Sequence, residues 1–235
     1  MKLGILQCGH APDPVAAKHG DFDQMFARLF AATDESPDFD YRVWNVVDLD
    51  FPAGPEEADA WLLTGSKHGA YEDHPFIPPL EDLIRAIHGS GRRMLGICFG
   101  HQIIAKALGG TVEKFKGGWA LGRQAYEIAP LGPIHLNAWH QDQVTTLPAG
   151  AEVLGGNDFC QNAALVYDDS ILTIQPHPEL RPNIIGDYLA ARAGDPAYPE
   201  ALIARAKDEN DKPTDDTRFA GVMAAFLQHG REALR

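Results

Sequence analysis

Apolar residues in the first hundred positions alternate between short continuous runs and stretches with helical spacing. The continuous runs predict buried strands at residues 2–7, 42–47, 60–64 and 93–97. Apolar positions three and four apart predict helices at 22–30, 77–88 and 100–108. Strands that alternate with helices predict an α/β fold, in which a mostly parallel sheet carries helices on both faces. In such sheets a functional site lies at the carboxyl ends of the strands.

The pattern changes after residue 109 to short apolar segments separated by Gly, Pro and Asp. These segments predict strands at 124–128, 134–137, 143–146, 152–154, 164–167 and 171–174. We interpret them as antiparallel additions at one edge of the sheet together with its last central strand. Residues after Glu179 follow a mainly helical pattern, interrupted by a polar stretch at 207–216. We therefore expect one α/β domain at 1–182 and a helical C-terminal extension at 183–235, packed on the same domain.

Composition removes several functional classes. The chain has 235 residues and a formal net charge of −13, with no conspicuous run of Lys or Arg, so we expect no nucleic-acid partner and no anionic membrane surface. A signal peptide and a membrane span are not predicted, because no apolar stretch is long enough for either. Three cysteines without CxxC spacing predict neither a disulfide framework nor a thiolate zinc site, so we expect a reducing cytoplasm.

The segment Gly96-Ile97-Cys98-Phe99-Gly100 carries the first chemical signal. A nucleophile on a sharp turn between a strand and a helix needs small residues two positions away on either side. The start of the following helix favours a thiolate at Cys98, because free N–H groups and the helix dipole point at it. The N–H of Phe99 is then a candidate oxyanion donor. The competing interpretation is a tight turn around an inert, buried cysteine.

A second signal follows the last predicted strand, in Gln175-Pro176-His177-Pro178-Glu179. A cysteine nucleophile needs a base, and the base needs a group that orients it. The prolines exclude a regular helix, and in an extended segment the side chains of His177 and Glu179 point the same way. Glu179 can then accept a hydrogen bond from one imidazole nitrogen while the other nitrogen faces the thiol.

Together these two motifs resemble the class I (triad) glutamine amidotransferases, in the stand-alone group similar to the glutaminase domain of GMP synthetase. The resemblance covers about residues 2–179 and implies a flavodoxin-like fold. It also implies that Cys98, His177 and Glu179 hydrolyse the side-chain amide of glutamine. The catalytic chemistry implied by the family needs neither a metal nor an organic cofactor.

The resemblance implies roles for further residues. The segment around Gly65 is similar to the loop whose glycine N–H completes the oxyanion hole. Gln102 matches a position that contacts bound glutamine. Residues 138–142 are similar to the segment that holds the amino-acid end of the substrate, which makes Trp139, Gln141 and Asp142 candidate contacts.

Two departures from the family pattern leave the substrate open. Many synthetase-linked members have a Gly-Gly-Pro-Gly type of loop where this chain has Thr64-Gly-Ser-Lys-His-Gly69, and the helical tail is longer than in a minimal glutaminase. The first interpretation is a glutaminase that releases ammonia through a γ-glutamyl thioester. The second is a γ-glutamyl peptidase that cleaves a γ-glutamyl peptide or conjugate. A third is a non-catalytic, DJ-1-like regulatory protein, which the His177 and Glu179 pair argues against.

Partners follow from the first interpretation. Ammonia made at such a site is usually passed to an acceptor enzyme, and we expect no ATP-dependent acceptor module on this chain. A separate synthetase or acceptor subunit is therefore the expected partner, and an oxyanion hole that forms only in its presence is one alternative left open.

Overall fold

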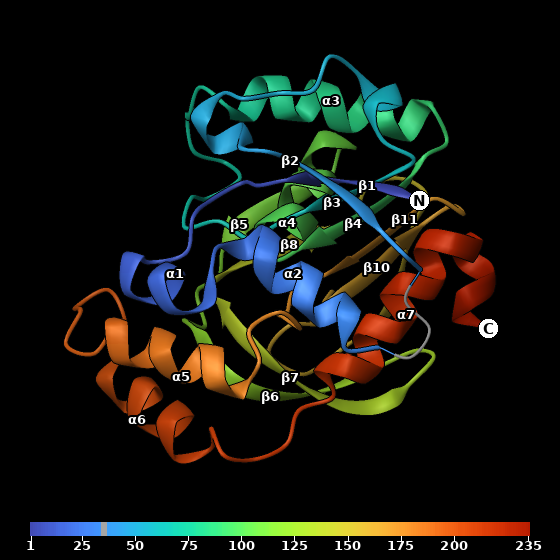
Figure 1. Cartoon of the computed structure of the whole chain (residues 1–235). Coiled ribbons are helices and arrows are strands. Elements are labelled where there is room, and N and C mark those ends of the chain that lie inside the picture. The colour runs from blue at the N-terminus through green and yellow to red at the C-terminus, as the bar shows by residue number, and fades with distance from the viewer. Residues whose placement is uncertain (34–36) are drawn as a thin grey trace.

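A nine-stranded sheet forms the centre of the protein in the computed structural model, which describes residues 1–33 and 37–235 (Figure 1). Five neighbouring strands are parallel, in the order β2-β1-β3-β4-β11. They are β2 (Asp40–Trp44), β1 (Lys2–Leu6), β3 (Ala60–Leu63), β4 (Arg93–Ile97) and β11 (Ile171–Ile174). This order, with β1 between β2 and β3, is that of a flavodoxin-like fold, as the resemblance implied.

Four antiparallel strands continue the sheet beyond β11. They are β10 (Ala164–Tyr167), β9 (Ala151–Gly156), β6 (Ala120–Ile128) and β7 (Gly132–His140), in that spatial order. The expected antiparallel edge is thus confirmed, with β11 as the last parallel strand.

One predicted edge strand belongs elsewhere. Residues 143–146 lie in β8 (Asp142–Thr146), which pairs only with β5 (Thr111–Lys114) in a separate two-stranded sheet. The sequence did not predict β5 because only one of its four residues, Val112, is buried, so its apolar pattern is weak. The predicted strand at 42–47 was also wrong at its end, because residues 46–48 form a 3-10 turn.

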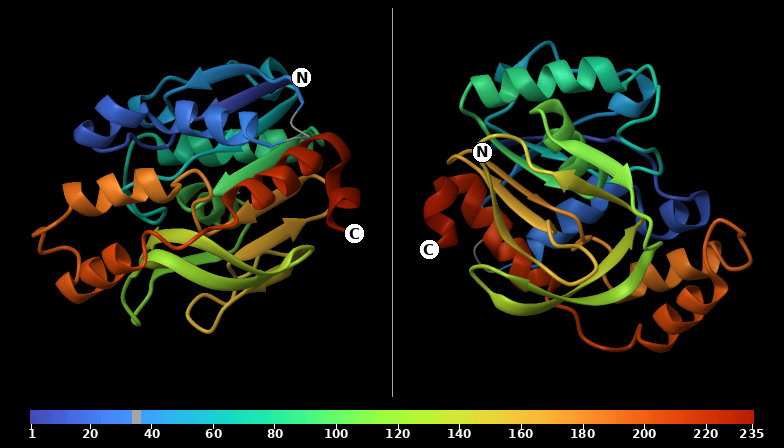
Figure 2. Two further views of the ribbon diagram at one scale, coloured as in Figure 1. Left: turned by 60° about the horizontal axis from the view of Figure 1, so that its bottom comes forward. Right: turned by 180° about the vertical axis from the view of Figure 1, so that it is seen from behind.

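Helices cover both faces of the parallel strands (Figure 2). On one face lie α2 (Phe22–Ala31) and α7 (Asp216–His229), and on the other lie α3 (Ile77–Gly89) and α4 (Phe99–Ala107). Neighbouring strand residues divide between the two cores: Leu62 and Leu95 pack with the first pair of helices, whereas Leu63 and Met94 pack with the second. Alternate side chains of a strand point to opposite faces, so strands buried on both sides read as continuous apolar runs.

Three further helices gather at the left of the view in Figure 1. They are α1 (Asp13–His19), α5 (Pro182–Ala191) and α6 (Glu200–Asp208); α1 packs on α5, and α6 packs on β6. The sequence did not predict α1, which buries only Val15. The polar interruption expected at 207–216 is shorter in the structure, because α7 starts at Asp216, which is buried and accepts a hydrogen bond from Arg181. Among the described residues, no helix is long and apolar enough to cross a membrane.

Candidate active site

Cys98 sits on a sharp turn between β4 and α4. Its backbone has a φ of 53° and a ψ of −102°, a strained conformation that non-glycine residues adopt rarely and chiefly at functional sites. Glycine is required on both sides: a Cβ on Gly100 would lie 2.4 Å from the Leu63 carbonyl oxygen, and one on Gly96 would lie 2.7 Å from the Gly100 oxygen. The expectation of small neighbours two residues from the nucleophile is confirmed.

The side chains of His177 and Glu179 are in contact, as predicted from their spacing in an extended segment. His177 Nδ1 donates to Glu179 Oε1 over 2.6 Å, and both side chains are buried. The backbone holds the imidazole in place, because His177 N–H donates to the Asn137 carbonyl over 2.8 Å and Asn137 Nδ2 donates to the Leu180 carbonyl over 2.7 Å.

Buried charge keeps His177 protonated. Burial lowers the pKa of its imidazole, but the Glu179 carboxylate and the Cys98 thiol together raise that pKa well above its ordinary value. Glu179 is fully buried and its Oε2 has no hydrogen-bond partner among the described residues. His177 is therefore the group that compensates the carboxylate, and its imidazolium lies beside the Cys98 side chain.

Two other histidines lie close to the nucleophile but are held neutral. Burial lowers the pKa of His101 and of His140 to about 3 in each case. His101 Nδ1 is hydrogen-bonded to Thr173 Oγ1 over 2.8 Å, so this imidazole is part of the buried polar packing. His177 is thus the histidine suited to be the base.

Two backbone N–H groups next to Cys98 are not used by the fold. Those of Phe99 and Gly65 have no hydrogen-bond partner within residues 1–33 and 37–235. The loop after β3 passes close to the turn after β4: a Cβ on Gly65 would lie 3.8 Å from Cys98 Cβ and 2.8 Å from His177 Cε1. These positions suit the expected pair of oxyanion donors.

Replacement of Gly65 by alanine is expected to lower kcat about 10²- to 10³-fold, the range for loss of an oxyanion-hole donor. The added methyl group collides with an imidazole that Glu179 and Asn137 hold in place, so the collision displaces either His177 or the loop. Steady-state hydrolysis of glutamine or a γ-glutamyl dipeptide measures the loss. Gly89→Ala is the matched control, since its Cβ meets nothing within 4 Å. Equal activity of the Gly65 and Gly89 variants would contradict the assignment.

A cavity of about 370 Å³ opens over Cys98 and His177. Its walls include all four residues predicted to contact substrate: Gln102, Trp139, Gln141 and Asp142. Gln102 Nε2 is already engaged, because it donates to the Asp142 carbonyl over 2.9 Å and to Gln175 Oε1 over 3.1 Å. Its amide therefore positions the 138–142 segment.

The acidic side chain on this wall is Asp142. Burial raises the pKa of its carboxyl group, and Tyr71 OH donates to Asp142 Oδ1 over 3.2 Å. Gln141 Nε2 donates to the Phe115 carbonyl over 3.2 Å, which ties the same segment to the turn after β5. The wall thus presents a carboxylate suited to an α-ammonium group.

The sequence did not predict that the cavity has an aromatic wall, which Trp119, Tyr188 and Tyr198 form together with Trp139. Trp119 and Tyr198 have ring centroids 4.8 Å apart, and the Trp139 ring lies 5.1 Å from that of Tyr198 and 5.5 Å from that of Tyr188. Beside them, Arg192 Nε is buried without a hydrogen-bond partner in the described part of the chain. Tyr188, Arg192 and Tyr198 come from the C-terminal extension, and their isolated positions carry no periodic signal.

Comparison with known proteins agrees with this geometry. The family model "Glutamine amidotransferase class-I" matches residues 69–193. The chain is 31% identical to gamma-glutamyl peptidase 4 of Arabidopsis thaliana, over 76% of each chain. It is 32% identical to the GMP synthase of Pyrobaculum aerophilum, over 67% of this chain and 32% of that protein. A glutamine amidotransferase from Thermotoga maritima has the same fold, with a TM-score of 0.74 and 20% identity over 100% of this chain and 97% of that one.

Proposed function

Because this chain belongs to the class-I glutamine amidotransferase family, we propose that it hydrolyses a γ-glutamyl amide bond, with glutamine as a substrate that releases ammonia. The observation that carries the proposal is the arrangement of Cys98 on its strained turn beside the buried His177–Glu179 pair.

In the proposed reaction the Cys98 thiolate attacks the γ-carbonyl carbon, and its electron pair forms the C–S bond while the carbonyl oxygen becomes an oxyanion. The N–H groups of Phe99 and Gly65 bind this oxyanion. The imidazolium of His177 gives its proton to the leaving nitrogen as the C–N bond breaks. Neutral His177 then takes a proton from water, which attacks the γ-glutamyl thioester and releases glutamate and the thiol.

The same site supports a second candidate, a γ-glutamyl peptidase. Ammonia is a small leaving group that needs no subsite, whereas the aromatic wall offers apolar surface and Arg192 offers a free donor. A peptide or conjugate that leaves with an amine and a carboxylate suits both features. The similarity to gamma-glutamyl peptidase 4 of Arabidopsis thaliana also favours this candidate.

Turnover of glutamine and of a γ-glutamyl dipeptide with an aromatic second residue, measured side by side, distinguishes the two candidates. We expect Tyr198→Ala to raise KM for the dipeptide about two- to tenfold, since an aromatic contact is worth about 0.5–1.5 kcal/mol, and to leave glutamine kcat/KM nearly unchanged. Tyr198→Phe keeps the ring and is the control. Equal effects on both substrates would contradict a leaving-group subsite at this wall.

We also propose that residues 1–182 form the catalytic domain and that residues 183–235 pack on it as an extension. In support, α7 shares a buried core with β1 and β4, and α5 and the segment after it supply the aromatic wall. If the physiological product is ammonia, we propose that a separate acceptor subunit uses it. Glutaminase activity that rises when a synthetase is added would support such a partner.

A further inference from the structure

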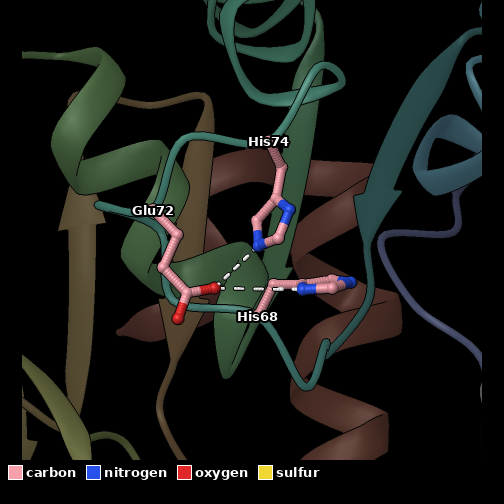
Figure 3. A group of neighbouring side chains, drawn as sticks. All are labelled: His68, Glu72 and His74. Carbon is pink, nitrogen blue, oxygen red and sulfur yellow. Dashed lines mark hydrogen bonds and ion pairs between the residues drawn. The ribbon is translucent and has the colours of Figure 1, made fainter.

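The loop between β3 and α3 brings together two imidazoles and a carboxylate (Figure 3). His74 Nε2 lies 2.8 Å from Glu72 Oε2, and His68 Nδ1 lies 3.9 Å from the same oxygen. One ligand atom of each residue lies within 4.8 Å of those of the other two. From the sequence, no metal ligand was expected.

The loop positions these side chains independently of any ligand. The buried ring of Phe76 supports both imidazoles, with centroid distances of 5.7 Å to His68 and 5.9 Å to His74. The Gly69 N–H donates to Glu72 Oε2 over 3.0 Å, which orients the carboxylate. The two imidazole rings have centroids only 4.0 Å apart, so a nitrogen of each lies close enough to the Glu72 carboxylate for the three residues to share one ion.

We propose that His68, Glu72 and His74 bind a divalent transition-metal ion of the zinc type. Two imidazoles and one carboxylate are a donor set that zinc takes, with bond lengths of about 2.0–2.2 Å and ligand atoms about 3.4 Å apart in tetrahedral geometry. The observed separations of 2.8 Å and 3.9 Å lie on either side of that value. The ion takes the place of the direct contact between His74 and Glu72, and water completes the coordination.

The site adjoins the catalytic cavity. His68 and Glu72 line the same cavity as Cys98, and the loop that carries the three ligands also contains the candidate oxyanion donor Gly65. A bound ion cross-links positions 68, 72 and 74 and places positive charge on the wall that also carries Asp142. The metal therefore stabilises one conformation of the loop that completes the site.

Metal binding is best measured in the Cys98→Ala protein, because a thiolate beside an imidazole is itself a zinc ligand pair. Titration with Co²⁺ followed by visible absorption, and with Zn²⁺ by calorimetry, is expected to show one ion bound per chain. Neither measurement depends on hydrolysis, so a negative binding result can be distinguished from a failure of the proposed function. No binding by the Cys98→Ala protein would overturn the proposal.

Substitutions assign the ligands. In the same background, His74→Ala and Glu72→Gln are each expected to weaken binding at least about tenfold. Glu72→Gln keeps an oxygen that can accept from Gly69, so a fold defect does not explain its loss. His88→Ala is the matched control, because His88 also lies beside a carboxylate, 3.4 Å from Asp168, at a different cavity. Unchanged affinity in the His74 and Glu72 variants, or a loss with His88→Ala, would overturn the assignment.

Discussion

Replacement of Cys98 by alanine is expected to reduce hydrolysis of glutamine and of γ-glutamyl peptides by at least about 10⁴-fold, because no thioester can form. The strained backbone at Cys98 and its place beside the buried His177 single it out among the three cysteines. Glutamate release under steady-state conditions measures the loss. Covalent labelling by a glutamine-like electrophile, followed by mass spectrometry, is expected to disappear in the same variant.

The matched control is Cys160→Ala. Cys160 is also a free, buried cysteine, but burial raises the pKa of its thiol to about 12, so it is protonated and unreactive at neutral pH. The Cys160 variant is expected to keep both activity and labelling. Labelling that persists in Cys98→Ala would show that the nucleophile is another residue.

Replacement of Glu179 by glutamine is expected to lower kcat by up to about 10⁴-fold, the effect of the comparable carboxylate-to-amide change in a Ser-His-Asp triad. In the proposed reaction Glu179 acts through His177, as a positioning residue. The carboxylate orients the imidazole over a 2.6 Å hydrogen bond and is the larger of the two charges that raise its pKa.

The pH profile separates this role from a merely structural one. In the wild type, His177 stays protonated to a pH well above its ordinary value, so kcat/KM is expected to fall on the alkaline side, as the imidazolium loses its proton. Without the Glu179 charge the pKa of His177 falls, and this alkaline limb moves to lower pH. Exposed Glu232→Gln is the control. An unmoved limb in a folded Glu179→Gln protein, checked by circular dichroism, would contradict the electrostatic role.

The raised pKa of His177 also makes the stability of the protein depend on pH. Because the pKa of His177 is higher in the folded state than in the unfolded chain, its interaction with Glu179 stabilises the protein fully below the unfolded-state pKa, about 6.5. That contribution is lost as pH rises through the folded-state value. Loss of the carboxylate should therefore remove stability mainly on the acidic and neutral side.

Local sequence was sufficient wherever a few neighbouring residues set the geometry. The turn around Cys98 was predictable because Gly96 and Gly100 are two positions away on either side, where close backbone contacts exclude a side chain. The His177–Glu179 pair was predictable because residues two apart in an extended segment share a side. The parallel strands were predictable because burial on both faces makes continuous apolar runs.

Other features could not be predicted, because the residues that decide them are far apart in the sequence. Strand β8 has an ordinary strand pattern, and only pairing with β5 decides that it leaves the main sheet. The aromatic wall joins Trp119 and Trp139 with Tyr188 and Tyr198, which meet only because α5 and the segment after it fold over the cavity.

The sequence by itself therefore determined the parallel α/β core, the sharp turn at Cys98 and the pairing of His177 with Glu179, since each depends on short-range sterics or periodicity. Tertiary structure alone decided that Gly65 lies against His177, that an aromatic wall lines the same cavity as Cys98, and that His68, Glu72 and His74 converge. The physical reason is that irregular loops and cavities have no period. Their shape follows from long-range packing, which brings side chains together without leaving a pattern along the chain.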